Sequence, residues 1–322
     1  MTMQNALVIK AKGGLGNRML SGVTGLVLAR LQGRAPFIDW RDGMYVPAGE
    51  NLYPLLFNAN WMGDISALDN ASDVAPSIWS GRLQQHPTDL IHAEFPDAHQ
   101  HPLIYRKLSV DLAGTAPQNS VAVFWSYVSK LKRLKRQMAR HPDFGGKALD
   151  AVTRAMLDRY FDPVSEVKEL VDAALPRDDR PAIGVHIRFT DRKAPLGKIM
   201  GRLARLRDSE PGARLFLATD SITAQEAVLA RFPDAVQIDK SLDAAGAALH
   251  VASGQFADPV AEARNALADM VALSRCDWLV HSSHSTFSVT AALMGDIPES
   301  RQIDVDRFNP KVRLKQFVQA RI

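Results

Sequence analysis

Cysteine is nearly absent from this chain: Cys276 is the single cysteine among 322 residues. One thiol has no partner for an intrachain disulfide, so the fold does not depend on an oxidising compartment. The sequence also lacks a run of about 18 strongly apolar residues, which excludes a transmembrane helix. Its first ten residues lack the basic start and long apolar segment of a signal peptide. We therefore expect a cytoplasmic protein, with a peripheral position at the inner membrane surface as the alternative.

The chain has little excess charge of either sign, since 39 Lys and Arg against 35 Asp and Glu give +4. This excess is too small to indicate nucleic-acid binding. Acidic residues are missing, however, from residues 130–140, which hold six basic ones. Leu131, Leu134 and Met138 recur there at helical spacing and predict an amphipathic helix with a solvated basic face. Aromatic residues are not interleaved with these charges, so no nucleic-acid partner is expected.

Two series of alternating strands and helices organise the sequence. The first opens with a strand, a glycine turn, a helix and a strand, which form a βαβ unit ending at Asp39-Trp40. The next stretch, residues 42–118, is rich in loop-forming residues and predicts one strand near Asp89–Ala93. The second series begins at the strand Pro181–His186 and closes with a helix at Ser285–Met294.

The length of the chain fits two domains of ordinary size. We expect an N-terminal α/β domain over residues 1–150 and a C-terminal α/β domain over residues 151–322. The last helix can pack back on the N-terminal domain. Ligands of such domains bind at the carboxyl ends of the parallel strands.

The glycine turn Gly13–Arg18 lies between the first strand and the first helix. Glycines there let backbone N–H groups approach a phosphate or a sugar, and the helix dipole favours negative charge. A dinucleotide fingerprint would need glycine in place of Met19, and the Gly-Lys-Ser/Thr of a Walker A motif is missing. The turn is therefore either purely structural or a ligand contact of another kind.

Polar residues follow three strands of the second series. Arg188 ends one strand, where its guanidinium needs either a diphosphate or an ion pair with a carboxylate such as Asp191. Another strand ends at Asp220 and Ser221, which fit an N-cap as well as a ligand. Residues 281–287 offer hydroxyls and N–H groups before a helix, which suit a phosphate.

Metal ligands are sparse. His281 and His284 have ligand-like spacing but no Cys or carboxylate close in sequence, and Asp304-Val305-Asp306 resembles the metal-binding Asp-x-Asp of one glycosyltransferase class. We expect no metal site.

In their order along the chain, these motifs resemble the GDP-fucose fucosyltransferases, specifically the branch with the rhizobial nodulation and animal core α1,6-fucosyltransferases. The motifs are Gly14-Leu15-Gly16-Asn17-Arg18, Ile38-Asp39-Trp40-Arg41, His186–Asp191, Leu217-Ala218-Thr219-Asp220, and Asp269 followed by Ser285. The resemblance implies a GT-B fold, with two Rossmann-like domains facing across a cleft. In such a fold, residues 1–150 would form the acceptor side and residues 151–322 would bind the nucleotide sugar. The resemblance also implies inverting, metal-independent transfer of fucose from GDP-fucose to a glycan or lipid-linked glycan acceptor, without a cofactor.

The resemblance implies roles for single residues as well. Arg188 would hold the β-phosphate of the donor, while His186 and Asp269 would contact the nucleoside. The other donor-binding positions would be Gly14, Gly16, Asn17, Asp220, Ser283, His284 and Ser285. Asp39 and Asp191 join Arg188 as catalytic candidates, because the acceptor hydroxyl can use a carboxylate base.

Two positions depart from the family pattern. Phe189 stands where the family usually has a second Arg, and Leu196 stands where the animal enzyme has its proposed catalytic Glu. These departures leave the acceptor open. They also keep a second interpretation: a non-catalytic homologue of the same fold that binds a sugar nucleotide or a glycan.

Overall fold

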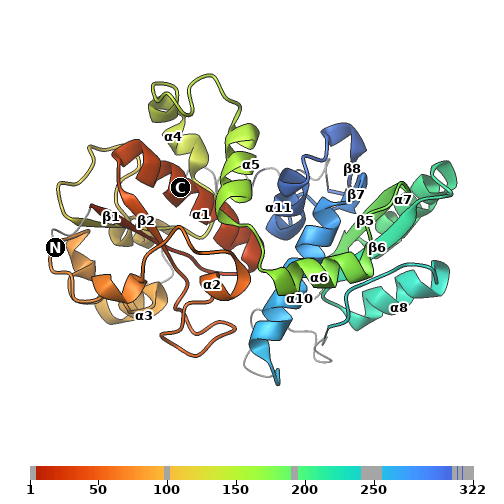
Figure 1. Cartoon of the computed structure of the whole chain (residues 1–322), viewed down its shortest axis with the longest axis horizontal. Helices are drawn as coiled ribbons and strands as arrows, with labels where there is room; N and C mark the ends of the chain where they lie inside the picture. Colours follow the sequence, from red (N-terminus) through yellow and green to blue (C-terminus); the bar gives the residue numbers. More distant parts are fainter. Residues whose placement is uncertain are drawn as a thin grey trace. The chain divides into compact units, whose positions relative to one another are not determined.

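The computed structural model describes residues 5–97, 102–189, 195–240 and 256–306, with residues 310 and 314. The chain forms two compact units (Figure 1): unit 1 reaches to Asp162, and unit 2 is Pro163–Leu314. Whereas the sequence suggests a boundary at residue 150, α5 (Leu149–Tyr160) belongs to unit 1 because it packs on α1 of that unit. The expected packing of the last helix concerns residues 315–322, which lie outside the described residues.

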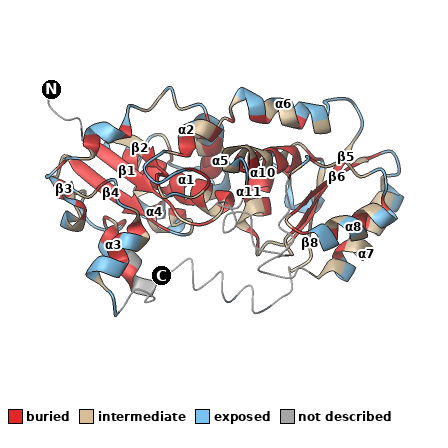
Figure 2. Ribbon diagram, turned by 90° about the horizontal axis from the view of Figure 1, so that it is seen from below, coloured by how far each residue is buried: buried red, intermediate tan, exposed pale blue. Residues whose placement is uncertain are grey.

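Unit 1 is built on a four-stranded parallel sheet in the order β2-β1-β4-β3. Its strands are β1 (Ala6–Lys10), β2 (Ala35–Asp39), β3 (Val74–Ala75) and β4 (Val121–Trp125). Every residue of β1 and β4 is buried, as the red central strands of Figure 2 show. The apolar runs read as strands in the sequence are therefore the interior of this sheet.

Helix α1 (Leu15–Gln32) connects β1 to β2 and packs on the sheet, which confirms the predicted βαβ unit. Gly33 ends the helix in the left-handed conformation, with φ of 63°. The other α-helices of unit 1, besides α5, are α2 (Tyr53–Leu56), α3 (Pro87–Glu94) and α4 (Leu131–Met138).

One expectation for unit 1 is wrong and another is confirmed. Residues 89–93 belong to helix α3 and not to a strand, because the His86 ring caps the Thr88 N–H and Pro87 occupies the first turn. Helix α4 has the predicted amphipathic character: its Leu131, Leu134 and Met138 side chains are buried.

Unit 2 is built on a second parallel sheet, in the order β6-β5-β7-β8. Its strands are β5 (Ala182–Ile187), β6 (Arg214–Thr219), β7 (Trp278–His281) and β8 (Gln302–Asp304). The short β8 is not apparent from the sequence. The apolar stretch at residues 235–238 contacts this sheet through a single bridge, between Val236 and Phe216.

Alternation along β5 assigns its side chains to two helical layers. Ile183, Val185 and Ile187 pack with the apolar side chains of α7 (Leu196–Ser209) and α8 (Ile222–Arg231). Gly184 lies on the opposite face, where an added Cβ would stand 3.0 Å from Leu273 and 3.1 Å from the Cys276 sulfur. The remaining α-helices of unit 2 are α6 (Ser165–Ala174), α10 (Pro259–Ser274) and α11 (Thr286–Met294).

In each sheet, later strands are added on both sides of the first strand. In unit 1 the chain passes from β1 to β2 on one side and later to β4 on the other; in unit 2 it passes from β5 to β6 and later to β7. Ligands of open α/β sheets bind at the carboxyl ends of the strands at such switch points. No helix in the described part of the chain is long and apolar enough to cross a membrane.

Candidate functional site in unit 2

Polar groups gather at the switch point of unit 2. His186 lies near the end of β5 and His281 ends β7, while Asp269 comes from α10 and Ser285 precedes α11. All four residues are buried. The β5 alternation that turns Ile187 toward α7 and α8 turns His186 to the face where α10 packs. We call these four residues, with Arg188 and Lys240, the unit 2 edge cluster.

His186 presents a neutral, buried imidazole. Its ring stacks on Phe287 of α11, with 5.1 Å between the ring centres. Burial, with smaller effects from His281, Arg188 and Lys240, lowers the pKa of His186 to about 3. Its Nδ1 is buried and finds no hydrogen-bond partner among the described residues. The ring therefore keeps one nitrogen available to a ligand.

Asp269 is a carboxylate with one occupied oxygen. Its Oδ2 accepts a hydrogen bond from the Lys240 ammonium, and both side chains are enclosed. Its Oδ1 is buried without a partner in the part of the chain that the structure describes. Burial raises the pKa of Asp269 above its usual value, against the opposing effect of Lys240. An incoming N–H donor at Oδ1 would stabilise the charged form.

The loop before α11 presents donors at a helix N-terminus. Ser285 occupies the N-cap, but its buried hydroxyl makes no cap bond and has no partner within the described residues. The Asp304 carboxylate accepts from the Ser283 N–H at 3.0 Å, and the Asp306 carboxylate accepts from the Ser282 hydroxyl. These aspartates brace the loop, so the first N–H groups of α11 and the Ser285 hydroxyl are held ready for an anion.

Arg188 follows β5 directly and is partly exposed. The residue after it, Phe189, donates its backbone N–H to Asp220 at 2.7 Å. Asp220 thereby ties the end of β6 to the segment that carries Arg188, while Ser221 caps α8 as one of the two sequence interpretations proposes. Asp191 lies outside the described residues.

The cluster thus combines buried donors and acceptors that have no partner among the described residues. Buried polar groups in native proteins are nearly always hydrogen-bonded, because an unpaired one costs about 1–3 kcal/mol. Three such atoms belong to His186, Asp269 and Ser285, and a fourth is Nε2 of His281. Their convergence at one sheet edge indicates a ligand with both donors and acceptors.

The glycine turn of unit 1 lies at the other switch point. Gly13 has φ of +83°, and an added Cβ would stand 2.6 Å from the Tyr127 ring, so this position requires glycine. Arg18 donates its Nε to the Gly13 carbonyl at 2.7 Å and pairs with Asp42. Oδ1 of Asn17 and one Nη of Arg18 are buried without a partner among the described residues. The turn therefore also offers unused polar atoms.

Asp39, a candidate catalytic base, lies in a closed ionic network of unit 1. Its Oδ2 accepts from Lys10 at 2.7 Å and its Oδ1 accepts from the Arg41 Nε at 3.0 Å. Arg41 also forms a two-point contact with Asp69. Burial opposes ionisation of Asp39, but Lys10 and Arg41 outweigh it and hold its pKa below the usual value. With a side chain that is 0% exposed, Asp39 is arranged to hold β1 and β2 together.

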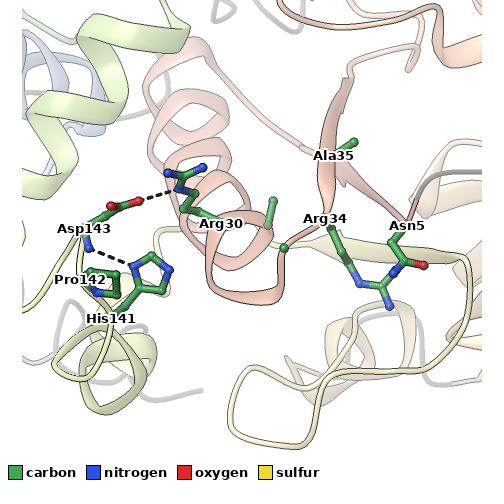
Figure 3. A pocket seen from close by; sticks show the side chains of 9 residues that line it. Asn5, Arg30, Arg34, Ala35, His141, Pro142 and Asp143 are labelled. Carbon is green, nitrogen blue, oxygen red and sulfur yellow. Dashed lines mark hydrogen bonds and ion pairs between the residues drawn. The ribbon is translucent and has the colours of Figure 1, made fainter.

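A pocket of about 680 Å³ opens in unit 1, at the edge of the sheet opposite the unit 1 switch point. Figure 3 shows Asn5 and Arg34 on one side of it and Arg30, His141 and Asp143 on the other. Asn5 and Ala35 stand at the amino ends of β1 and β2, and Arg30 pairs with Asp143 at 2.6 Å. The guanidinium of Arg34 donates to the backbone carbonyls of Ala6 and Pro117. The charged side chains of Arg30, Arg34 and Asp143 thus already have partners within unit 1.

Within the described ranges, no three His, Cys, Asp or Glu side chains are grouped so as to hold a metal ion. His281 instead makes a hydrogen bond with Ser288 through Nδ1, at 3.1 Å.

Residues 182–319, nearly all of unit 2, match the family Nodulation protein Z (NodZ). The predicted family resemblance is confirmed. Fucosyltransferase NodZ from Bradyrhizobium is 20% identical, with a TM-score of 0.60 over 90% of this chain and 94% of that chain. NodZ α-1,6-fucosyltransferase soaked with GDP-fucose is also 20% identical, with a TM-score of 0.61 over 90% and 93%.

A plant enzyme is similar as well. FUT1 from Arabidopsis thaliana in complex with GDP is 16% identical, with a TM-score of 0.51 over 92% of this chain and 71% of that chain. No curated protein sequence matches significantly. The comparisons confirm the predicted α/β fold of the GT-B type for this NodZ-like chain.

The sequence misses Lys240 of the unit 2 edge cluster and the contact that Phe287 makes with the cluster. Lys240 reaches Asp269 from 29 positions away in sequence, so no local pattern announces the pair. The feature of the sequence that could have indicated Lys240 is its charge, just beyond the apolar stretch Ala235–Ile238. Phe287 is visible in the motif at residues 281–287, but its stacking on His186 depends on the packing of α11.

Proposed function

We propose that the protein is a fucosyltransferase that takes GDP-fucose as its donor and binds the GDP part at the unit 2 edge cluster. The observation that carries the proposal is the convergence of unpartnered buried atoms of His186, Asp269 and Ser285 beside Arg188. The relatives crystallised with GDP-fucose or GDP support this choice of donor.

Each group in the cluster has a distinct part in donor binding. The Asp269 carboxylate accepts from the base, and the neutral His186 ring contacts the nucleoside. The Ser285 hydroxyl and the start of α11 face the diphosphate, since helix N-termini favour anions. The N–H groups of Ser283 and His284 hold this loop in place by donating to Asp304 and Ser282. Asp220 positions the Arg188 segment through the Phe189 N–H. The turn residues Gly14, Gly16 and Asn17 of unit 1 stay predicted donor contacts.

Arg188 is the proposed catalytic residue, with Asp191 as a candidate base. As the bond between the anomeric carbon and the β-phosphate oxygen breaks, negative charge grows on that phosphate. A guanidinium placed there is worth more in the transition state than in the ground state. The acceptor hydroxyl gives its proton to the base and attacks the anomeric carbon from the face opposite the leaving group. This attack inverts the configuration at the anomeric carbon. Because Arg188 and the α11 N-terminus neutralise the leaving group, the reaction requires no divalent metal.

The acceptor is a glycan or a lipid-linked glycan, and the protein works in the cytoplasm or at the inner membrane surface. A membrane position is supported by α4, whose Lys132, Lys135 and Arg136 are exposed and have no ion-pair partner in the described part of the chain. Cations near an anionic lipid surface contribute about 1 kcal/mol each.

A non-catalytic donor-binding homologue is the second candidate. It is favoured by Phe189 and Leu196, which pack against the apolar cluster of unit 2 and carry no charge. Arg188 alone then remains of the two arginines usual in the family.

Calorimetric titration with GDP and UDP, followed by a transfer assay with GDP-fucose, tests the proposal. We expect GDP to bind far more tightly than UDP, and the anomeric proton of the product to report inversion. Equal affinity for GDP and UDP would contradict the donor site. Tight GDP binding with neither transfer nor donor hydrolysis would favour the non-catalytic homologue.

A further inference from the structure

The Lys240–Asp269 ion pair is unusual for its enclosure. The side chains are 8% and 3% exposed, so both charges have lost most of their hydration. Such a pair stabilises a fold little, because the desolvation cost offsets the attraction. The pair also does not satisfy Asp269, whose Oδ1 has no partner among the described residues. These facts suit a recognition surface better than a structural link.

The pair presents a defined sequence of hydrogen-bonding groups. The Lys240 ammonium has three donors, of which one is used on Oδ2. A carboxylate oxygen has two acceptor sites, so Oδ2 keeps one and Oδ1 keeps both. The pair therefore offers a donor, an acceptor and an acceptor side by side. This is the order that cytosine presents to guanine in a base pair.

We propose that Lys240 is a specificity-determining residue that donates to O6 of guanine while Asp269 accepts from N1–H and N2–H. The inference rests on the proposed GDP donor and adds a contact to it. Guanine matches all three groups. Hypoxanthine and uracil match two, and adenine presents a donor to the ammonium and an acceptor to the carboxylate, so it is rejected.

A change in the ligand, combined with a change in the protein, tests this contact directly. 6-Thio-GDP keeps N1–H and N2–H but replaces O6 with sulfur, a weaker acceptor. Hydrogen bonds to charged groups are worth about 1.5–3 kcal/mol, so wild type should prefer GDP by about tenfold in calorimetric titrations. Lys240→Met should abolish that preference, and Lys240→Arg, which keeps a donor, should restore most of it.

The same substitution at an exposed lysine of unit 1, Lys147→Met, is the matched control and should keep the wild-type preference. If Lys240→Met lowers the affinities for GDP and 6-thio-GDP by the same factor, the preference stays intact. Lys240 then acts only as the counter-ion of Asp269, and the inference is wrong. Wild type that binds GDP and 6-thio-GDP equally also overturns it, and this test needs no folded variant. Wild type that binds neither nucleotide shows instead that the proposed donor site has failed.

Discussion

Two buried aspartates of this protein have opposite surroundings. In unit 1, Asp39 has cations on both oxygens, and its pKa lies below the usual value. In unit 2, Asp269 meets one cation on one oxygen and has a pKa above the usual value, while its other oxygen has no partner in the described part of the chain. Both stand near the carboxyl ends of parallel sheets, where catalytic carboxylates are expected. A carboxylate with both oxygens paired to cations holds the fold, whereas a carboxylate with one oxygen left over is available to a ligand.

The largest expected effect is on stability, at Asp39. Asp39→Asn leaves the buried Lys10 and Arg41 without their shared counter-ion, and breaking a buried pair typically costs about 3–5 kcal/mol. We expect a large fall in the free energy of unfolding by urea, with the GDP affinity of the folded protein unchanged. Asp179→Asn, at an exposed aspartate, is the control and should leave stability near wild type. A normally stable Asp39→Asn enzyme that has lost transfer activity would restore Asp39 as the base.

The next effect is catalytic, at Arg188. Loss of one such transition-state contact costs about 3–4 kcal/mol, so Arg188→Ala should lower the rate of transfer by roughly 10²–10³. Arg188→Lys should recover little, since a point charge does not reproduce the planar fork of a guanidinium.

Arg205→Ala, at an exposed arginine of α7, should keep the wild-type rate. The apo melting temperature separates function from structure. A destabilised Arg188→Ala protein that binds GDP normally would mean that Arg188 is a structural ion-pair partner.

A smaller effect concerns pH. The folded protein holds His186 neutral, with a pKa of about 3, while the unfolded chain binds a proton near pH 6.5. Below pH 6.5 the unfolded state therefore takes up more protons, and stability falls as the pH falls. From pH 7 to pH 5 this costs about 2 kcal/mol. Urea unfolding of His186→Gln should show a shallower pH dependence than wild type. His92→Gln, at an exposed histidine, should match wild type; an equally steep His186→Gln profile would contradict the buried neutral ring.

The smallest expected effect is that of metal removal. If Arg188 and the N-terminus of α11 neutralise the leaving diphosphate, EDTA should leave the rate of transfer within about twofold of the untreated enzyme. If EDTA abolishes activity and Mn²⁺ restores it, the prediction is wrong. Asp304 and Asp306, which brace the loop before α11, would then be the candidate metal ligands.

Local signals explain what the sequence could predict. The glycine turn, the strand that ends at His186 and Arg188, and the helix after Ser285 each depend on residues that are adjacent in the chain. The three-residue strand β8 is too short to show a period. In α3, the adjacent apolar residues Leu90 and Ile91 resemble a strand until the cap at His86 is seen.

The sequence does not predict how each of the two carboxylates is paired, because some of their partners are distant in the chain. Asp39 is two positions from Arg41 in sequence, but its partner Lys10 comes from another strand, 29 positions away. Nothing local distinguishes a saturated Asp39 from an open Asp269. Their difference appears only when long-range partners are known.

Calorimetric titration of GDP into Asp269→Asn, with a thermal melt of the apo variant, tests the central contrast most directly. The account predicts that GDP affinity falls by roughly tenfold to a hundredfold, because one acceptor becomes a donor. It also predicts a smaller fall in melting temperature than for Asp39→Asn, because Asp269 pairs with one cation and Asp39 with two. Asp179→Asn should bind GDP as wild type does. A folded Asp269→Asn protein with wild-type affinity for GDP would contradict the account.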